Sequence, residues 1–157
     1  AKSSTLTGCK MTASQFSEMS VLTSQLISTQ FTLTRCDKVL FENTFLEHNS
    51  ISRGTFLNTT ITHSKWNSIK IVKSAFKEST FHKSTFKHTK FRNCLFEGMT
   101  ATDLTLTGIE FIDCTFKNCQ ISNVHIICEN PVQISGKTFD NKQIFAIHTL
   151  EDLLVIG

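Results

Sequence analysis

Apolar residues recur at every fifth position of the chain from Leu6 to Ile126. Because 39% of all residues are apolar, 25 fixed positions would all be apolar by chance about once in 10^10 sequences, so the period is a structural signal. The positions are Leu6, Met11, Phe16, Val21, Leu26, Phe31, Cys36, Phe41, Leu46, Ile51, Phe56, Ile61, Trp66, Ile71, Phe76, Phe81, Phe86, Phe91, Phe96, Ala101, Leu106, Phe111, Phe116, Ile121 and Ile126.

A period of five fits neither an α-helix, with 3.6 residues per turn, nor a strand, with a period of two. No straight element keeps all these side chains on one face. The pattern therefore predicts a chain that turns a corner every five residues and points one large side chain inward on each side.

A second inward position lies two residues before each of these centres. Nineteen of its 25 occupants are small or β-branched, mostly Ser and Thr, which indicates that space there is tight. Three of the larger exceptions cluster around Ala101, where the centre itself is small, and this suggests volume compensation within one packed core. The exceptions are Met19, Asn49, Ile69, Met99, Leu104 and Ile109.

The repeating unit [Ser/Thr/Cys]-x-[Phe/Leu/Ile]-x-x resembles that of the pentapeptide-repeat proteins, over about three quarters of the chain. It is cleanest in the four consecutive units SAFKE, STFHK, STFKH and TKFRN, residues 74–93. The resemblance implies an all-β fold, a right-handed quadrilateral parallel β-helix with four pentapeptides per coil and about six coils.

Four pentapeptides per coil place each residue over the one 20 positions later, which predicts four inward columns. One column contains Phe16, Cys36, Phe56, Phe76, Phe96 and Phe116, and the next Leu6, Leu26, Leu46, Trp66, Phe86, Leu106 and Ile126. The other two contain Met11, Phe31, Ile51, Ile71, Phe91 and Phe111, and Val21, Phe41, Ile61, Phe81, Ala101 and Ile121. We interpret these aromatic side chains as core filling rather than as a ligand platform.

The period fails after Ile126, where Pro131 and Gly136 occupy the apolar phases. We therefore divide the chain into a β-helix, residues 1–130, and a C-terminal segment, residues 131–157. Residues 132–135 are expected to form a last strand, residues 137–141 a polar turn, and Leu150 to begin a short helix capped by Thr149. The apolar tail either covers the open end of the β-helix or forms a dimer interface, through Ile144, Phe145, Ile147, Leu150, Leu153 and Leu154.

The six cysteines show no Cys-x-x-Cys spacing typical of a zinc site. Five of them fall on inward positions, so we interpret them as buried free thiols. Cys94 and Cys114 are 20 residues apart, and a coil spacing of about 4.8 Å makes a disulfide between them geometrically conceivable.

Positive charge is concentrated in residues 65–92, where eight cations face the single acid Glu78 in a chain of net charge +3. The densest group on one predicted face is Arg53, Lys70, Lys73, Lys90 and Arg92. This group predicts either contact with an anionic partner surface or simply a solvated surface. Its sign is opposite to that of the acidic pentapeptide-repeat dimers that resemble DNA and bind type II topoisomerases.

The sequence offers no catalytic constellation. No two histidines are 20 residues apart, the acids are scattered, and no Gly-rich phosphate loop is present. We therefore expect no enzymatic activity, no cofactor and no metal.

Together these features predict a rigid, non-enzymatic module that binds another protein, as a monomer or a C-terminal homodimer, with a bacterial secreted effector as one setting. One alternative is a gyrase-interacting DNA mimic, which the positive charge disfavours. The other is a receptor-like luminal domain, because residues 91–96 and 111–119 resemble the Phe-rich repeats of synaptic vesicle glycoprotein 2, and glycosylation of the sequon at Asn58 would support it. No apolar run long enough to span a membrane and no leader is visible, so a cytoplasmic location, or secretion without a cleavable signal, is expected.

Overall fold

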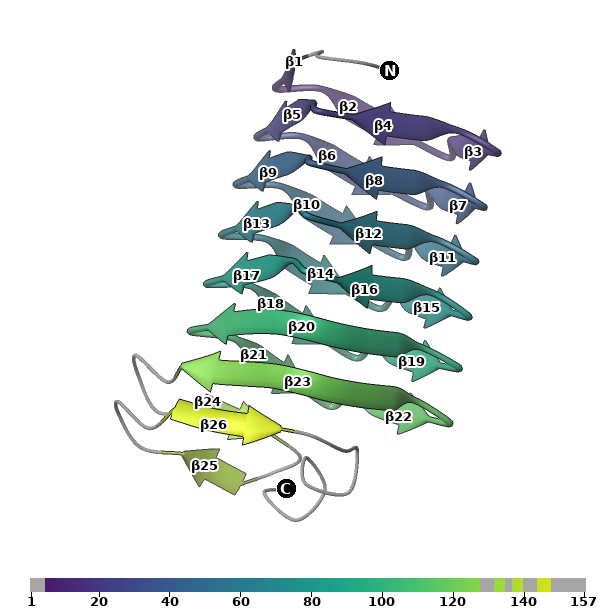
Figure 1. The fold of residues 1–157 in the computed structure, drawn as a ribbon. Coiled ribbons are helices and arrows are strands. Elements are labelled where there is room, and N and C mark those ends of the chain that lie inside the picture. The colour runs from purple at the N-terminus through teal and green to yellow at the C-terminus, as the bar shows by residue number, and fades with distance from the viewer. Residues whose placement is uncertain (1–4, 128–131, 135–136, 140–143, 148–157) are drawn as a thin grey trace.

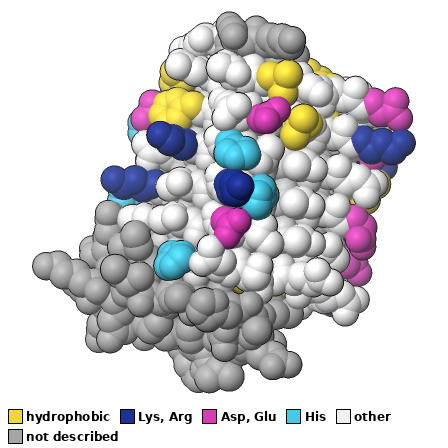
Figure 2. Space-filling view, in the orientation of Figure 1, with side chains coloured by type: hydrophobic (Ala, Val, Ile, Leu, Met, Phe, Trp, Pro, Cys, Tyr) yellow, Lys and Arg dark blue, Asp and Glu magenta, His cyan; other side chains and the backbone are white. Residues whose placement is uncertain are grey.

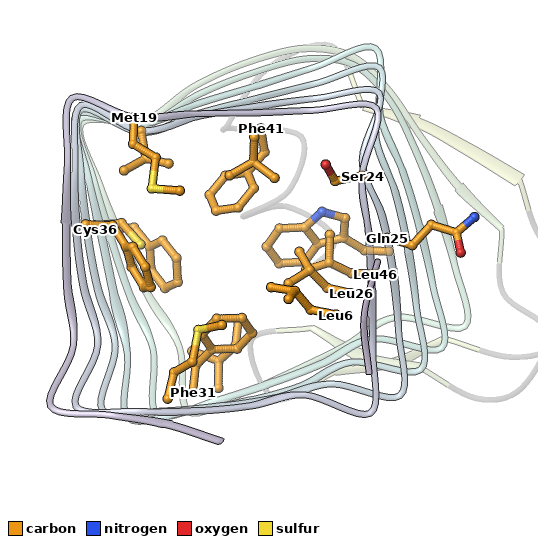
Figure 3. A pocket seen from close by; sticks show the side chains of 16 residues that line it. Leu6, Met19, Ser24, Gln25, Leu26, Phe31, Cys36, Phe41 and Leu46 are labelled. Carbon is orange, nitrogen blue, oxygen red and sulfur yellow. The ribbon is translucent and has the colours of Figure 1, made fainter. Parts of the chain in front are cut away.

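Each pentapeptide forms one short strand and one corner, and four of them complete a square coil (Figures 1 and 3). The computed structural model describes residues 5–127, 132–134, 137–139 and 144–147, with the side chains of residues 5–125. Two of the faces each contain six parallel strands, so the predicted all-β quadrilateral β-helix of about six coils is confirmed. No helix long and apolar enough to cross a membrane occurs among these described residues.

The four faces are numbered here in chain order. The first face contains β1 (Thr5–Thr7), β5 (Gln25–Ile27), β9 (Phe45–Glu47), β13 (Lys65–Asn67) and β17 (Thr85–Lys87). The second contains β2 (Lys10–Thr12), β6 (Gln30–Thr32), β10 (Ser50–Ser52), β14 (Lys70–Val72), β18 (Lys90–Arg92) and β21 (Glu110–Ile112).

The third face contains β3 (Gln15–Ser17), β7 (Arg35–Asp37), β11 (Thr55–Leu57), β15 (Ala75–Lys77), β19 (Leu95–Glu97) and β22 (Thr115–Lys117). The fourth contains β4 (Ser20–Leu22), β8 (Leu40–Glu42), β12 (Thr60–Thr62) and β16 (Thr80–His82). In the last two coils, β20 (Thr100–Thr107) and β23 (Gln120–Ile127) run across both the fourth and the first face (Figure 1).

Strands of neighbouring coils pair in parallel with an offset of 20 residues, as the sequence predicts. Phe56 pairs with Cys36 on one side and with Phe76 on the other, and Trp66 pairs with Leu46 and Phe86 in the same way. The four predicted columns are therefore real.

The corners explain why the period is five. The residue two positions after each inward centre adopts the left-handed conformation, with φ between 45° and 56° at 21 non-glycine corners of the described residues. Such a conformation is costly for L-residues, and Gly98 and Gly108, which occupy two of these corners, adopt it without that cost. One left-handed residue after each three-residue strand redirects the chain onto the next face.

Stacked aromatic rings fill the C-terminal half of the core. Phe56, Phe76, Phe96 and Phe116 form one continuous column, with ring centroids 4.7 to 5.3 Å apart and interplanar angles of 7° to 8°. Rings of adjacent columns meet edge to face, as Phe76 does with Phe91 at 6.2 Å. Pairs of this kind stabilise a fold by about 0.5–1.5 kcal/mol each beyond their buried area.

Compensation around Ala101 is incomplete. Met99, Leu104 and Ile109 are buried, as the volume argument predicts, but a cavity of about 40 Å³ remains between them and the surrounding phenylalanines. The larger neighbours therefore replace only part of the volume that the small centre lacks.

The small polar residues before each centre bridge neighbouring coils, and tight space is only part of their explanation. The Ser64 hydroxyl accepts from the Thr44 N–H at 3.1 Å and donates to the Thr62 carbonyl at 2.9 Å. Asn49 does the same with an amide, because its Oδ1 accepts from the Thr29 N–H at 2.6 Å and its Nδ2 donates to the Leu26 carbonyl at 2.7 Å. Buried backbone groups at the bends thus find partners.

Three short strands follow the coils. β26 (Ile144–Ile147) pairs antiparallel with β23, and β24 (Val132–Ile134) pairs antiparallel with β25 (Lys137–Phe139). The predicted strand at residues 132–135 is thus observed as β24, but the predicted polar turn at 137–141 is wrong in its first half, since residues 137–139 pair as a strand. Leu150, Leu153, Leu154 and the predicted helix lie outside the described residues.

Replacing Asn49 with Leu is expected to lower the free energy of unfolding by about 1–3 kcal/mol, because the Thr29 N–H and the Leu26 carbonyl lose their partner. Urea denaturation followed by circular dichroism measures this loss. Asn49→Thr is the matched control, since Thr29 and Thr89 occupy the same row and a hydroxyl still bridges the coils. Equal losses in both variants would contradict the bridging role.

Candidate partner-binding face

The second face presents its outward side chains in straight rows. The residue before each inward centre forms one row, the residue after it a second, and the corner residue a third. Lys70 on β14 pairs with Lys90 on β18, and Val72 pairs with Arg92. The positions of these side chains along the face follow directly from the coil register.

The predicted basic group Arg53, Lys70, Lys73, Lys90 and Arg92, here called the basic cluster, is brought together by the fold. The Lys73 N–H donates to the Arg92 carbonyl at 2.9 Å, and the Arg53 N–H donates to the Val72 carbonyl at 3.0 Å, so the two corner residues adjoin the strand rows. All five side chains are exposed.

One member of the basic cluster is neutralised by a neighbour that the sequence-based grouping left out. Lys90 Nζ lies 2.8 Å from Glu110 Oε1, one coil further along the same row. Within the described part of the chain, the other four cations have no carboxylate within ion-pair distance. The cluster therefore retains four uncompensated positive charges on three consecutive coils.

The third face is electrostatically different, because its charges alternate along the row. Lys77 Nζ contacts Glu97 Oε2 at 2.9 Å, and Lys117 follows Glu97 in register. The hydrogen bond from Lys77, with the charge of Lys77, lowers the pKa of Glu97 below its ordinary value of 4.5. A face of this kind is internally balanced and leaves little charge for a partner.

The fourth face, at the front of Figure 2, interleaves cations, acids and histidines. His63 and His82 lie with ring centroids 6.2 Å apart, His82 Nδ1 is 2.7 Å from Thr102 Oγ1, and Asp103 Oδ2 is 3.8 Å from His82. The sequence analysis considered only separations of 20 residues and so missed this contact, because a corner residue also meets the strand residue 19 positions later. No group of three or more potential metal ligands forms there or elsewhere in the described residues.

Cys94 and Cys114 are free thiols, as are the other cysteines of the described residues, Cys9, Cys36 and Cys119. A thiol–thiol hydrogen bond lowers the pKa of Cys94 and raises that of Cys114, and burial raises the pKa of Cys36 to about 12. Each thiol of the pair also approaches backbone carbonyls, at 3.4 to 3.6 Å. These thiols are part of the small-residue row and are not set up as nucleophiles.

The C-terminal group predicted as cap or dimer interface is only partly described. The backbone of Ile144, Phe145 and Ile147 pairs with β23, with Phe145 opposite Ile126. This strand therefore occupies part of the edge that the last coil would otherwise leave open, and the choice between cap and dimer interface stays a prediction.

Solved structures similar to this one include pentapeptide-repeat proteins. Rfr23 of the cyanobacterium Cyanothece 51142 superposes with a TM-score of 0.50 at 9% sequence identity, covering 76% of this chain and 89% of that chain. At such low identity the likeness establishes the fold alone, and it agrees with the square coil described above.

Two further structures align with lower scores. They are QnrB1, a plasmid-mediated fluoroquinolone resistance protein (TM-score 0.40, 13% identity, 78% of this chain and 82% of that chain), and HetL of Nostoc sp. strain PCC 7120, which is involved in heterocyst differentiation regulation (0.21, 8%, 88% and 90%). No protein-family model and no curated protein matches the sequence.

Lys77→Gln is expected to raise the pKa of Glu97 back toward 4.5, which a carboxyl 13C NMR titration measures directly. Since the folded-state pKa is depressed, this ion pair stabilises the fold above about pH 4.5 and the contribution disappears as the pH falls through the folded-state pKa. Lys117→Gln is the control and should raise the pKa less, because Lys117 acts on Glu97 through charge alone. Equal rises in the two variants would contradict this assignment.

Proposed function

Because the chain has the pentapeptide-repeat fold, we propose that it is a rigid, non-enzymatic protein-interaction module whose second face binds an acidic surface of a partner protein. The observation that carries this proposal is the basic cluster, in which four exposed cations without carboxylate partners stand on three stacked coils. A functional assignment has to rest on such a site, since one fold serves many functions.

Rigidity supports this assignment. The rows are held by parallel strand pairing and by buried side-chain bridges such as Asn49, so the charges keep a fixed spacing that follows the coils. A partner with acids at a matching spacing meets a preorganised surface and loses little conformational entropy on the side of this chain. Electrostatic complementarity of this kind contributes mainly to association rate and specificity.

An acidic protein is favoured over nucleic acid by what surrounds the cluster. The outward neighbours of the cationic residues on β14 and β18 are aliphatic or small, with Val72 beside Arg92 and Ile112 next in the same row. Single-stranded nucleic acid is typically held by aromatic side chains that stack on bases, and the aromatic rings of β18 and β21 belong to the buried or half-buried core. An aliphatic and cationic surface suits a protein better.

The test compares two double variants of equal net charge. Lys70→Glu with Arg92→Glu reverses the basic cluster, and Lys65→Glu with Lys83→Glu reverses two exposed cations on the first face and the corner before it. The probe is a fluorescent peptide of alternating Glu and Ala, and binding is followed by fluorescence anisotropy at low and physiological salt.

The expected result is that reversal of the basic cluster weakens binding by at least about tenfold, while the control pair changes it by less than about threefold. Equal effects would mean that only net charge matters and would contradict the proposal. Tighter binding of a DNA duplex with the same number of charges would replace the acidic protein with nucleic acid.

A further inference from the structure

The N-terminal half of the coil interior encloses an apolar cavity of about 80 Å³ that runs along the solenoid axis (Figure 3). Figure 3 shows Met19, Phe31, Cys36 and Leu46 pointing into it from different sides, whereas Gln25 points outward. The lining belongs to the first four coils and reaches from Leu6 to Trp66.

The cavity follows from the sequence of the columns. Where later coils place Phe in the first-face column, the first three coils place Leu6, Leu26 and Leu46. The third-face column likewise has Cys36 where the next coils have phenylalanines. Four smaller side chains per coil leave the axis unfilled, and the half-buried first coil leaves the cavity accessible from that end.

One polar group belongs to this apolar lining and has no partner. Trp66 is buried, with only 2% of its surface exposed, and its indole Nε1 forms no hydrogen bond within the described structure. Ser24 also lines the cavity, but its hydroxyl donates to the Leu22 carbonyl at 2.9 Å. Buried donors are normally paired, so an unpaired indole N–H beside an open volume indicates a missing acceptor.

We propose that the axial cavity binds a small neutral molecule with an apolar body and one hydrogen-bond acceptor, of the ketone or aldehyde class, whose carbonyl oxygen accepts from Trp66 Nε1–H. The apolar lining excludes a charged ligand, because burying a charge without a partner is strongly unfavourable. A dry cavity of about 150 Å³ accepts benzene, so a volume near half of that suits a body of about four or five heavy atoms.

The chain contains a single tryptophan, so one indole N–H resonance in a 1H–15N NMR spectrum reports on the site. The probes are 2-butanone and 2-methyl-1-butene, which share one shape and differ in having or lacking the carbonyl oxygen. We expect 2-butanone to shift the indole proton downfield in a saturable manner, and the alkene to perturb the lining methyl groups without that downfield shift.

Two variants keep the test decisive. Leu26→Phe fills the cavity, as Phe86 fills the same column lower down, and should weaken 2-butanone binding by at least about tenfold while the indole resonance of the folded protein persists. Trp66→Phe removes the donor, and leucine methyl shifts should then report equal affinities for the ketone and the alkene.

Three results would overturn the proposal: a shift that grows linearly without saturation, a shift unchanged in Leu26→Phe, or a long-lived water on the indole N–H that 2-butanone does not displace. Because Trp66 lies in the core and the basic cluster lies on the outer surface, the failure of this proposal leaves the binding role of the second face intact.

Discussion

In-register parallel pairing between residues 20 positions apart is the constraint on which the rest of the structure depends. It places like side chains over like, so that Phe56, Phe76 and Phe96 stack and Lys70 lies beside Lys90. The same pairing aligns the left-handed corners, and without them the chain would not stay in phase. Core, corners and surface rows are three consequences of one register.

The register makes the sequence unusually informative about the backbone and the core. Twenty-five apolar centres and the coil length implied by the resemblance were enough to predict every column, including the position of Trp66 over Phe86. Features that depend on side-chain chemistry at the bends were not predictable from the period. Asn49 appeared only as an oversized exception, yet its amide bridges two coils with two short hydrogen bonds.

The candidate site was predicted in composition but not in balance. Stacking by 20 residues grouped Arg53, Lys70, Lys73, Lys90 and Arg92, but the pairing of Lys90 with Glu110 depends on side-chain rotamers that a register does not specify. The contact between His63 and His82 was missed for a different reason, since corner and strand residues of adjacent coils meet at a separation of 19. The axial cavity depends on summed side-chain volumes, which the apolar phase alone leaves open.

Charge and volume vary independently within the same frame. The outward rows of the third face alternate in sign, whereas those of the second face accumulate positive charge over three coils. Inside, phenylalanines fill the later coils and smaller residues leave the earlier coils hollow. The fold thus provides a rigid lattice, and the functional proposals rest on where the sequence departs from uniform occupation of that lattice.

The most direct test of the 20-residue register is the removal of one whole coil. Deleting residues 75–94 joins Ser74 to Leu95, which takes the register position of Ala75, and deleting residues 75–92 joins Ser74 to Asn93 and shifts every later column. The register predicts that the 20-residue deletion retains the β-sheet circular dichroism and a single cooperative unfolding transition, while the 18-residue deletion loses both. Equal behaviour of the two deletions would contradict it.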